Sequence, residues 1–413
     1  MPYLILDPTE EYAELQKRFL DRLGLEAVAL FSSRGRLAQG EGGWRERLGE
    51  HVVGEYLVDR DALDDLARDL REAHPQGFFG LVPWDERHIL LAAELSEALE
   101  LDWNPRHVIE RFRDKALLKA WLRASSRVRV NRSRVVETDD EARAFQAEVG
   151  AWPVVVKPSG GAGSMSVYFA HDEEDLLAGC RRVLEAGLGE VLLEEFVGGT
   201  EFVANGIADH AGDVLVTDVW RYDRRDSHGE RNVYFHTWSV HSTEEPFAAV
   251  AEYAGEVVRA CGLRRSPFHM EVKVDDDGPC LIECGARFAG GNQPVLASHL
   301  QHHSIFELAA CHYLDDVAVS PLDVDFAHYD SYRACVVSGV QEVELPRIEA
   351  VLGLHEVQRL PSFLGIGMLR KPGRPAPVSR DVTSKAWEVY LLHRDDEQVR
   401  RDAERARRLL RYV

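Results

Sequence analysis

The sequence has few cysteines, and their spacing is irregular. Its 413 residues include six cysteines, at positions 180, 261, 280, 284, 311 and 335. No two of them are separated by only two residues, so the chain offers neither a usual zinc ribbon nor a disulfide framework. We therefore expect ordinary hydrophobic cores, which in a chain of this length predict two to four subdomains.

Long apolar runs and an excess of basic charge are also absent. No run of about 18 apolar residues would span a membrane, and no basic stretch followed by an apolar one marks a secretory leader. The formal net charge of −21 at pH 7 would repel nucleic acids and anionic membranes. We therefore expect a cytoplasmic protein with no nucleic-acid or membrane partner.

Two familiar nucleotide-binding motifs are missing as well. No GxGxxG follows the first predicted strand, which argues against a dinucleotide site, and GxxxxGK[ST] is absent, which excludes a P-loop. The first hundred residues nevertheless alternate between predicted strands and helices, a pattern typical of a doubly wound α/β domain with a parallel sheet. The predicted strands are 3–7, 26–32 and 78–82, and the predicted helices are 9–23, 61–73 and 85–99.

The next part of the chain carries several helix signals. Asn104-Pro105 reads as a cap followed by proline at the first helical position, and it predicts a helix that continues to about residue 123. Thr138 and Glu141 read as a capping box for a helix ending near Val149. Further elements are expected at 154–158, 173–186, 191–197 and 293–313, and a charged C-terminal helix near 395–410 is expected to be a solvated face.

The stretch 268–287, FHMEVKVDDDGPCLIECGAR, reads as a β-hairpin. Alternation places Glu271 on the face opposite Phe268, and Asp277 at the turn would set Glu271 directly across from Glu283. Directly opposed like charges are destabilising. Either this is a solvated hairpin face, or a divalent cation bridges the two carboxylates, as Mg²⁺ does when phosphates complete its shell.

Two other stretches suit a nucleotide. In VVVKPSGGAGSMSV, Lys157 ends an apolar strand and a glycine-rich loop follows, as a phosphate site requires, although a plain hairpin turn looks the same. In LLEEFVGGTEF, backbone groups of Glu195 and Val197 would bond an adenine edge and Glu201 would accept from ribose hydroxyls. The alternative is a strand that simply ends at the surface.

The order of these motifs resembles the ATP-grasp superfamily from about residue 105 to 310. The similarity is greatest to the carboxylate–amine ligase branch, which includes bacterial L-amino-acid ligases and carnosine synthase. The resemblance implies an α/β (α+β) ATP-grasp fold. Its expected parts are an N-terminal doubly wound α/β domain at 1–104, an ATP-grasp part with a lid subdomain at 105–199, a central antiparallel-sheet domain at 200–328 and a C-terminal domain at 329–413.

The resemblance also implies roles for particular residues. Arg287 would neutralise the transferred phosphoryl group, and His236 would contact the acyl donor, unless it is a strand histidine satisfied by its neighbours. Gly290 and Gly291 would leave room in an acceptor pocket, unless a turn requires them. The implied binding residues are Lys115 and Lys157 for phosphates, Gly161 and Ser164 in the lid loop, Glu194, Glu195 and Val197 for adenine, Glu201 for ribose, and Glu271 and Glu283 for Mg²⁺.

The chain departs from the family at one position. Many members have E-x-N-x-R, in which the asparagine binds a second Mg²⁺, but Gly285 stands there in this sequence. The substrate, water or Asn292 would complete the shell, or one metal would bind less tightly. We therefore expect ATP with one or two Mg²⁺ ions, for which Mn²⁺ can substitute.

The function implied by the resemblance is ATP-dependent ligation. A carboxylate, expected from an amino acid, would be activated as an acyl phosphate and attacked by an amine, giving a dipeptide or amide, ADP and phosphate. Two other functions stay open: a carboxylase that activates bicarbonate, and a non-catalytic nucleotide-binding regulator. For partners, the resemblance implies small-molecule carboxylate and amine substrates and a homodimer.

Overall fold

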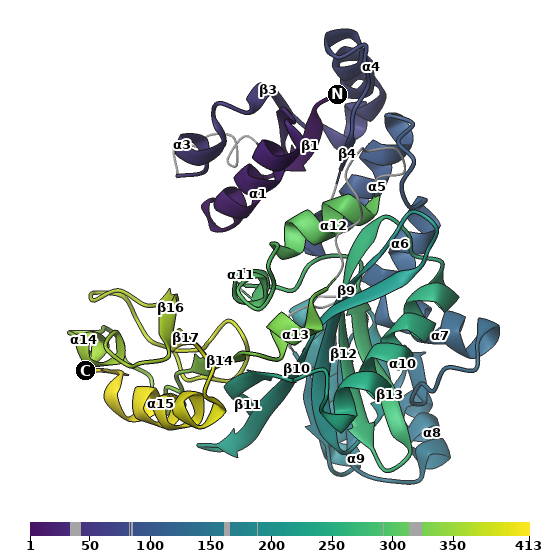
Figure 1. Cartoon of the computed structure of the whole chain (residues 1–413). Helices are drawn as coiled ribbons and strands as arrows, with labels where there is room; N and C mark the ends of the chain where they lie inside the picture. The colour runs from purple at the N-terminus through teal and green to yellow at the C-terminus, as the bar shows by residue number, and fades with distance from the viewer. Residues whose placement is uncertain are drawn as a thin grey trace.

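The computed structural model describes residues 1–33, 43–81, 83, 86–160, 166–187, 189–291, 293–313 and 324–413. Two predicted lid residues, Gly161 and Ser164, lie outside the described residues, as does Asn292. Figure 1 shows an N-terminal unit at the top, a large sheet through the middle and the C-terminal segment beside one end of that sheet.

The N-terminal unit is a parallel sheet in the order β3-β2-β1-β4. Its predicted parallel character is confirmed, and α1 ends as expected at Gly24, which adopts the left-handed conformation. The sequence reading missed β3, whose partly exposed residues carry no clear apolar alternation. The elements are β1 (Tyr3–Leu6), α1 (Glu10–Leu23), β2 (Ala27–Phe31), α3 (Trp44–Leu48), β3 (Val52–Leu57), η2 (Arg60–Ala62), α4 (Leu63–Ala73), β4 (Gly80–Leu81), η3 (Glu86–His88) and α5 (Ile89–Ala98).

The predicted single helix from 106 to 123 is wrong. Two helices occur, α6 (Arg106–Arg113) and α7 (Lys115–Ser125), because Asp114 is extended and its carboxylate accepts from the backbone N–H groups of Ala116 and Leu117. The predicted cap at Asn104 is also wrong. Pro105 holds the cap position, and the Asn104 side chain bonds the backbone of Arg264 instead.

A small unit follows, with a sheet in the order β5-β8-β6-β7. The capping box of Thr138 and Glu141 is confirmed and begins α8. Val154, Val156 and Leu193 from the strands pack with helix residues in a separate hydrophobic core. The elements are β5 (Ser133–Val136), α8 (Asp139–Val149), β6 (Val154–Pro158), β7 (Tyr168–Ala170), α9 (Glu173–Ala186) and β8 (Val191–Glu195).

The central sheet has eight strands in the order β13-β12-β9-β10-β11-β14-β17-β16, all paired antiparallel. The strands are β9 (Thr200–Ala208), β10 (Val214–Ser227), β11 (Glu230–Ser239), β12 (Ser266–Asp275), β13 (Gly278–Gly285), β14 (Arg333–Ser338), β16 (Phe363–Leu369) and β17 (Trp387–His393). Helix α10 (Glu245–Cys261) packs on β10 and β9. Because the sheet continues through β14, strands on both sides of residue 328 share it, and the division into four domains stays a prediction.

Two helix predictions near the C-terminus need correction. The segment 293–313 is interrupted, forming α11 (Gln293–Ser298) and α12 (Ile305–Tyr313). Helix α15 (Asp396–Leu409) is no solvated face throughout, because Val399, Ala403 and Ala406 are buried against β14 and β17. The remaining elements are α13 (Phe326–Tyr329), β15 (Val351–Leu352), α14 (Leu354–Val357) and β18 (Arg411–Tyr412).

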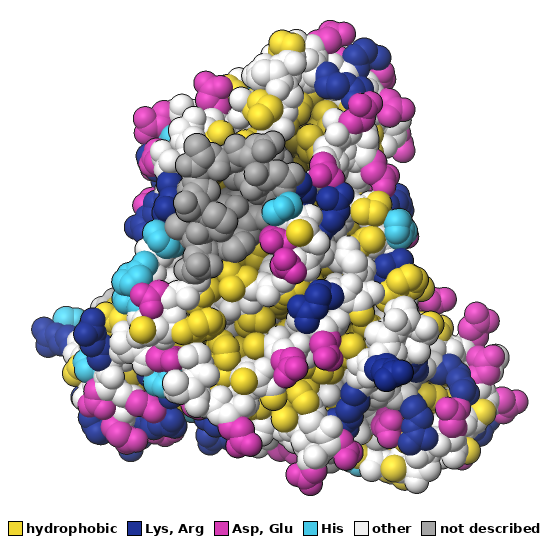
Figure 2. All heavy atoms as spheres, turned by 45° about the vertical axis from the view of Figure 1, so that its right-hand side comes forward, with side chains coloured by type: hydrophobic (Ala, Val, Ile, Leu, Met, Phe, Trp, Pro, Cys, Tyr) yellow, Lys and Arg dark blue, Asp and Glu magenta, His cyan; other side chains and the backbone are white. Residues whose placement is uncertain are grey.

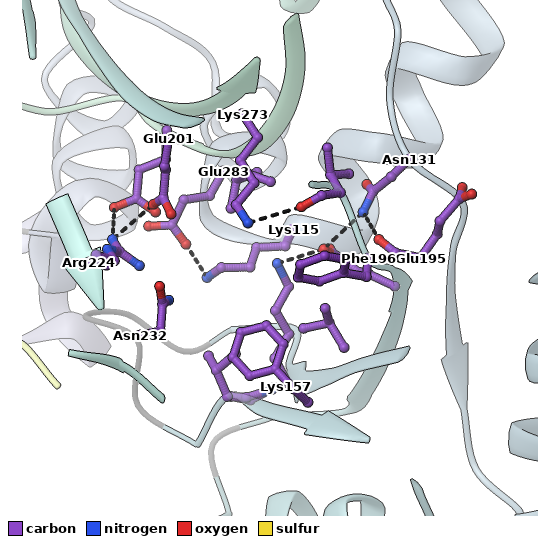
Figure 3. A pocket seen from close by; sticks show the side chains of 18 of the residues that line it. Lys115, Asn131, Lys157, Glu195, Phe196, Glu201, Arg224, Asn232, Lys273 and Glu283 are labelled. Atoms are coloured by element: carbon purple, nitrogen blue, oxygen red, sulfur yellow. Dashed lines mark hydrogen bonds and ion pairs between the residues drawn. The ribbon is translucent and has the colours of Figure 1, made fainter. Parts of the chain in front are cut away.

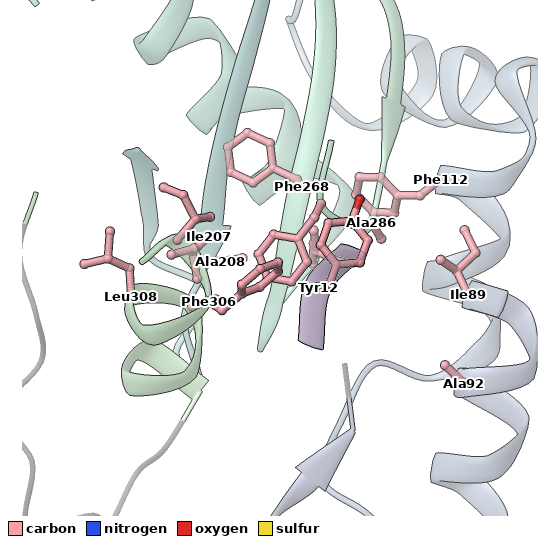
Figure 4. Close-up of a cluster of buried hydrophobic side chains, with 14 of the residues drawn as sticks. Tyr12, Ile89, Ala92, Phe112, Ile207, Ala208, Phe268, Ala286, Phe306 and Leu308 are labelled. Atoms are coloured by element: carbon pink, nitrogen blue, oxygen red, sulfur yellow. The ribbon is translucent and has the colours of Figure 1, made fainter. Parts of the chain in front are cut away.

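One hydrophobic core joins the N-terminal unit to the central sheet (Figure 4). The ring of Tyr12 from α1 meets Phe306 of α12 edge-on at 5.6 Å, and Phe306 meets Phe288 at 4.5 Å. The Tyr12 hydroxyl also donates to the carbonyl of Gly291 over 2.8 Å. Each fully buried aromatic or aliphatic side chain contributes about 1.5–3 kcal/mol, so this core fixes α1 against the loop after β13.

On the face shown in Figure 2, acidic, basic and hydrophobic side chains are interspersed. Across the residues that the structure describes, none of the helices combines the length and apolar character needed to cross a bilayer. The five cysteines whose side chains are described, Cys180, Cys261, Cys280, Cys284 and Cys335, are buried and free.

Candidate active site

The hairpin of β12 and β13 places Glu271 directly opposite Glu283, as predicted. The predicted pivot at Asp277 is wrong, however, because Asp275 pairs with Gly278 across a two-residue turn. That register would bring Glu271 opposite Ile282, and a bulge between the pairs Glu271–Glu283 and Val272–Leu281 adds the missing residue. The bulge therefore creates the opposed carboxylates.

Both carboxylates line a cleft between the four-stranded sheet β5-β8-β6-β7 and the central sheet (Figure 3). Lys115, the first residue of α7, reaches Glu283 with its Nζ 3.1 Å from Oε2. Because the cap at Asp114 starts α7 at this point, the break in the predicted helix also directs the side chain of Lys115 toward Glu283. Lys115 and Lys157, predicted to hold phosphates, lie in the same cleft.

The most buried charges of the cleft surround Glu194 of β8. Its carboxylate is 2.7 Å from the ammonium of Lys119 and 2.9 Å from that of Lys157. Burial alone would raise the pKa of Glu194, but the two ammonium groups prevail and lower it to about 2. Burial lowers the pKa of Lys119 to about 8. Lys119 escaped the sequence reading, because a lysine four residues after Lys115 reads as an ordinary solvated helix position.

The segment expected to bind adenine has its backbone partly engaged. The carbonyl of Glu195 accepts from Asn131 Nδ2 at 2.7 Å, and the carbonyl of Val197 accepts from Lys273 Nζ at 3.0 Å. A carbonyl oxygen has two lone pairs, so each can accept a further bond. The Glu195 side chain leaves the site and pairs with Arg132. Apolar side chains of Val155, Phe169, Phe196 and Ile282 line this end of the cleft.

At the other end, Arg224 of β10 lies between two carboxylates. Its Nη2 is 2.9 Å from Oε1 of Glu201 and 3.6 Å from Oε1 of Glu271. Burial and the neighbouring carboxylates of Glu283 and Glu201 raise the pKa of Glu271, whereas Lys115 outweighs burial and lowers the pKa of Glu283. Of the two opposed glutamates, Glu283 is therefore held in its charged form, whereas Glu271 takes up a proton more readily. A cation between them would favour the charged form of both.

The residues present fit a metal and a nucleotide. Two opposed carboxylates with phosphates beside them are a usual Mg²⁺ environment, although the described residues hold no ready group of three or more His, Cys, Asp or Glu ligands. The buried Nε of Arg224 also lacks a hydrogen-bond partner among the described residues. Polar atoms of this kind at a cleft indicate a ligand that would satisfy them.

A second cavity of about 960 Å³ adjoins the cleft and shares Glu271 and Glu283 with it. Arg287 lines this cavity, with its Nε bonded to Oε2 of Glu86 at 2.5 Å. A Cβ on Gly285 would lie 3.0 Å from the same Glu86 oxygen. Glu86, which no sequence reading assigned, therefore fills the space that a side chain at position 285 would take. The lining also includes Tyr222, Tyr234, Thr237, Gly290, Gly291, Val336, Ile366, Met368, Val382 and Tyr390, together with the charged residues Glu10, Lys385 and Glu388.

His236 does not line this cavity. A bulge at Phe235 pairs Tyr234 with Arg224 but His236 with Asp223, which turns His236 to the opposite face of the sheet. There its Nδ1 bonds Asp223 at 2.9 Å and its ring lies against Trp238. The interpretation of His236 as a substrate contact is thus corrected. A histidine that does line the cavity is His269, which lies two residues before Glu271 on β12 and therefore on the same face of the sheet.

Comparisons with known proteins agree with this geometry. Residues 151–294 match the ATP-grasp domain family. Dapdiamide A synthase of Enterobacter agglomerans is 31% identical over 252 residues, which are 58% of each chain. An uncharacterized protein of Sinorhizobium fredii is 29% identical over 194 residues, 46% of this chain and 39% of that protein. The matches thus span about half the length of these curated relatives.

Solved structures extend the likeness of fold to the whole chain. The L-amino acid ligase from Bacillus licheniformis superimposes with a TM-score of 0.75 at 19% identity, covering 100% of this chain and 98% of that one. The N5-carboxyaminoimidazole ribonucleotide synthetase from Thermotoga maritima gives a TM-score of 0.67 at 17% identity, covering 100% and 99%. The chain therefore has the predicted ATP-grasp fold, carries a match to the ATP-grasp domain family at residues 151–294 and resembles the carboxylate–amine ligase branch of that superfamily.

Proposed function

We propose that this protein joins the carboxylate of an amino acid, or a similar acid, to an amine at the expense of ATP. The observation that carries the proposal is that the cleft and the second cavity share a wall. Glu271 and Glu283 face both the cleft and the second cavity, and Arg287 lines the cavity beside them. A phosphoryl group bound in the cleft would therefore lie next to a carboxylate bound in the cavity.

The proposed reaction has two steps. A carboxylate oxygen attacks the γ-phosphorus, the bond to the β-phosphate oxygen breaks, and ADP leaves. The amine nitrogen then attacks the acyl carbon, the carbon–oxygen bond to phosphate breaks, and the nitrogen loses a proton. Most of the protein's contribution in such a reaction is positioning and neutralisation of charge.

Residues of the cleft would bind the nucleotide by exchanging their partners within the protein for groups of the nucleotide. Lys115 would turn from Glu283, and Lys157 from Glu194, toward phosphate oxygens. Glu201 would accept from the ribose, and backbone groups of Glu195 and Val197 would bond the adenine. Gly161 and Ser164 are proposed to belong to the lid loop.

Glu271 and Glu283 are the proposed metal ligands. When bound there, Mg²⁺ would neutralise charge on the β- and γ-phosphates. The number of ions, one or two, stays a proposal, and so does the substitution of Mn²⁺. Arg287 would neutralise the acyl phosphate, and Glu86 holds its guanidinium in position. A cytoplasmic location and a homodimer, both expected from the sequence, also stay predictions.

The test measures ADP, phosphate and amide with panels of amino-acid pairs. ADP should form in step with a new amide, and hydroxylamine should trap the acyl phosphate as a hydroxamate. Arg287→Ala should suppress both products. Arg143→Ala, which removes an exposed partner of Glu173 on the lid subdomain, is the control and should suppress neither. Release of AMP and pyrophosphate, or ADP formation that requires bicarbonate and no amine, would show that the reaction is a different one.

A further inference from the structure

Arg224 is a buried cation at one end of the cleft, and the proposed reaction does not use it. Its side chain is only 8% exposed. One nitrogen, Nη2, lies 2.9 Å from Glu201 and 3.6 Å from Glu271. Figure 3 shows it at the end of the cleft beside Glu201, with Lys115 directed to Glu283 close by. Arg224 thus joins the proposed ribose ligand to one proposed metal ligand.

Aromatic rings hold this guanidinium in place. Its central carbon lies 4.6 Å from the ring centre of Tyr222 and 4.1 Å from that of Tyr234. Stacking of this kind favours a cation over the ring face. Nε remains a buried donor with no hydrogen-bond partner among the described residues. The guanidinium is therefore confined to the cleft but has an unused donor available there.

The surrounding charges explain why a cation is needed. Glu201, Glu271 and Glu283 are all largely buried, and Lys115 is paired with Glu283. Buried carboxylates without a positive partner are costly. Arg224 supplies the positive charge on the side of Glu201 and Glu271.

The same arrangement conflicts with a metal ion. A divalent cation held by Glu271 and Glu283 would lie close to the guanidinium, which is 3.6 Å from Glu271 Oε1, and the two positive charges would repel. Resting on the nucleotide and metal sites of the proposed function, we propose that Arg224 takes the metal's place on Glu271 before Mg²⁺ binds. Mg²⁺ displaces it, and the freed guanidinium, with its unused Nε, turns to the phosphate oxygens.

Mg²⁺ binding without nucleotide tests this displacement. Arg224→Gln keeps a polar side chain but removes the competing charge, and Arg225→Gln is the matched control, since Arg225 is exposed and pairs with Asp223. The apparent Mg²⁺ affinity, measured from the rise in melting temperature, should increase at least about tenfold in Arg224→Gln and stay unchanged in Arg225→Gln. The affinity for an ATP analogue at saturating Mg²⁺ should fall about tenfold in Arg224→Gln alone. Equal Mg²⁺ affinity in the wild type and Arg224→Gln would overturn the proposal.

A measurement on the wild-type protein covers the case in which Arg224→Gln does not fold. Because the guanidinium lies against Tyr222 and Tyr234, its displacement should change the near-ultraviolet tyrosine spectrum when Mg²⁺ is added. Tyr234→Phe should reduce that change. Absence of any spectral change while Mg²⁺ and the analogue bind would overturn the displacement but leave the proposed function standing. If the wild type binds neither Mg²⁺ nor the analogue, the proposed function itself fails.

Discussion

The cleft and the adjoining cavity share two glutamates but differ in size and in the residues that line them. In the cleft, Glu194, Glu283 and Glu201 each have a lysine or arginine partner at 3.1 Å or less. The cavity is larger, about 960 Å³ against about 120 Å³, and its walls mix aromatic and aliphatic side chains such as Tyr390 with charged ones such as Lys385 and Glu388. A site whose charges are paired internally suits a polyphosphate that replaces those partners. A larger space with both apolar and charged walls suits a substrate that carries charged groups and a side chain.

The largest expected effect is on the two glutamates that the hollows share. Glu283→Gln should lower the rate of ADP formation by about a thousandfold or more, because a metal ligand and the partner of Lys115 are both lost, an effect of about 4 kcal/mol on the barrier. Glu271→Gln should act similarly. Steady-state rates at saturating ATP measure the loss. Near-normal activity in both variants would mean that the hairpin is only a charged face.

The charge pairing of the cleft can be broken at Glu194. Glu194→Gln leaves two buried lysines with a neutral partner, so the free energy of unfolding should fall by roughly 3–5 kcal/mol. The next residue is the matched control, because Glu195 pairs with Arg132 at the surface. Glu195→Gln should cost at most about 1 kcal/mol. Urea unfolding at pH 7 measures both variants, and equal losses would contradict the difference between a buried and an exposed pair.

The contrast between the two hollows also explains what the sequence could reveal. The cleft could be predicted because strand and turn patterns mark its parts locally, as at Lys157 and at the hairpin of Glu271 and Glu283. Arg224 and Lys119 could not be singled out, since nothing local distinguishes them from surface cations. Their burial depends on strands and helices that meet only in the folded chain.

The cavity could not be predicted from local sequence patterns. Its walls come from the beginning, middle and end of the chain, including Glu10, Tyr222 and Tyr390. Bulges are a further obstacle, because one added residue reverses the face of every later side chain. The bulge at Phe235 turned His236 away from the cavity, whereas the bulge at Ile282 aligned Glu283 with Glu271.

The cavity can be altered without touching the cleft at Gly290. A Cβ there would meet no atom within 4 Å, and its backbone does not require glycine. Gly290→Leu should therefore fold normally and fill part of the cavity. The KM for a bulky amino-acid substrate should rise about 10- to 100-fold, as expected when a pocket loses room for a few carbon atoms, whereas the KM for ATP should stay within about twofold of its original value. Equal changes in both constants would show that the two hollows are not separate sites.

The smallest expected effect concerns Asp7, which precedes the helix α1 that carries Glu10 into the cavity wall. Asp7 accepts from Ser32 and from Nε2 of His88 at 2.8 Å; burial alone would raise its pKa, but these bonds lower it below the usual value. A carboxylate with a lowered native pKa stabilises the fold above its unfolded pKa of about 3.9, and this contribution disappears as the pH falls through the native pKa. Asp7→Asn should therefore lower the free energy of unfolding by about 1–2 kcal/mol at pH 7 and by progressively less below about pH 4.

Urea unfolding at pH 7, 5 and 3.5 measures this effect. Asn tolerates the positive φ of 47° at position 7, so the substitution tests the charge and not the backbone conformation. The exposed Asp61→Asn is the control and should change stability by less than about 0.5 kcal/mol. A loss in Asp7→Asn that is the same at every pH would show that the Asp7 charge contributes nothing.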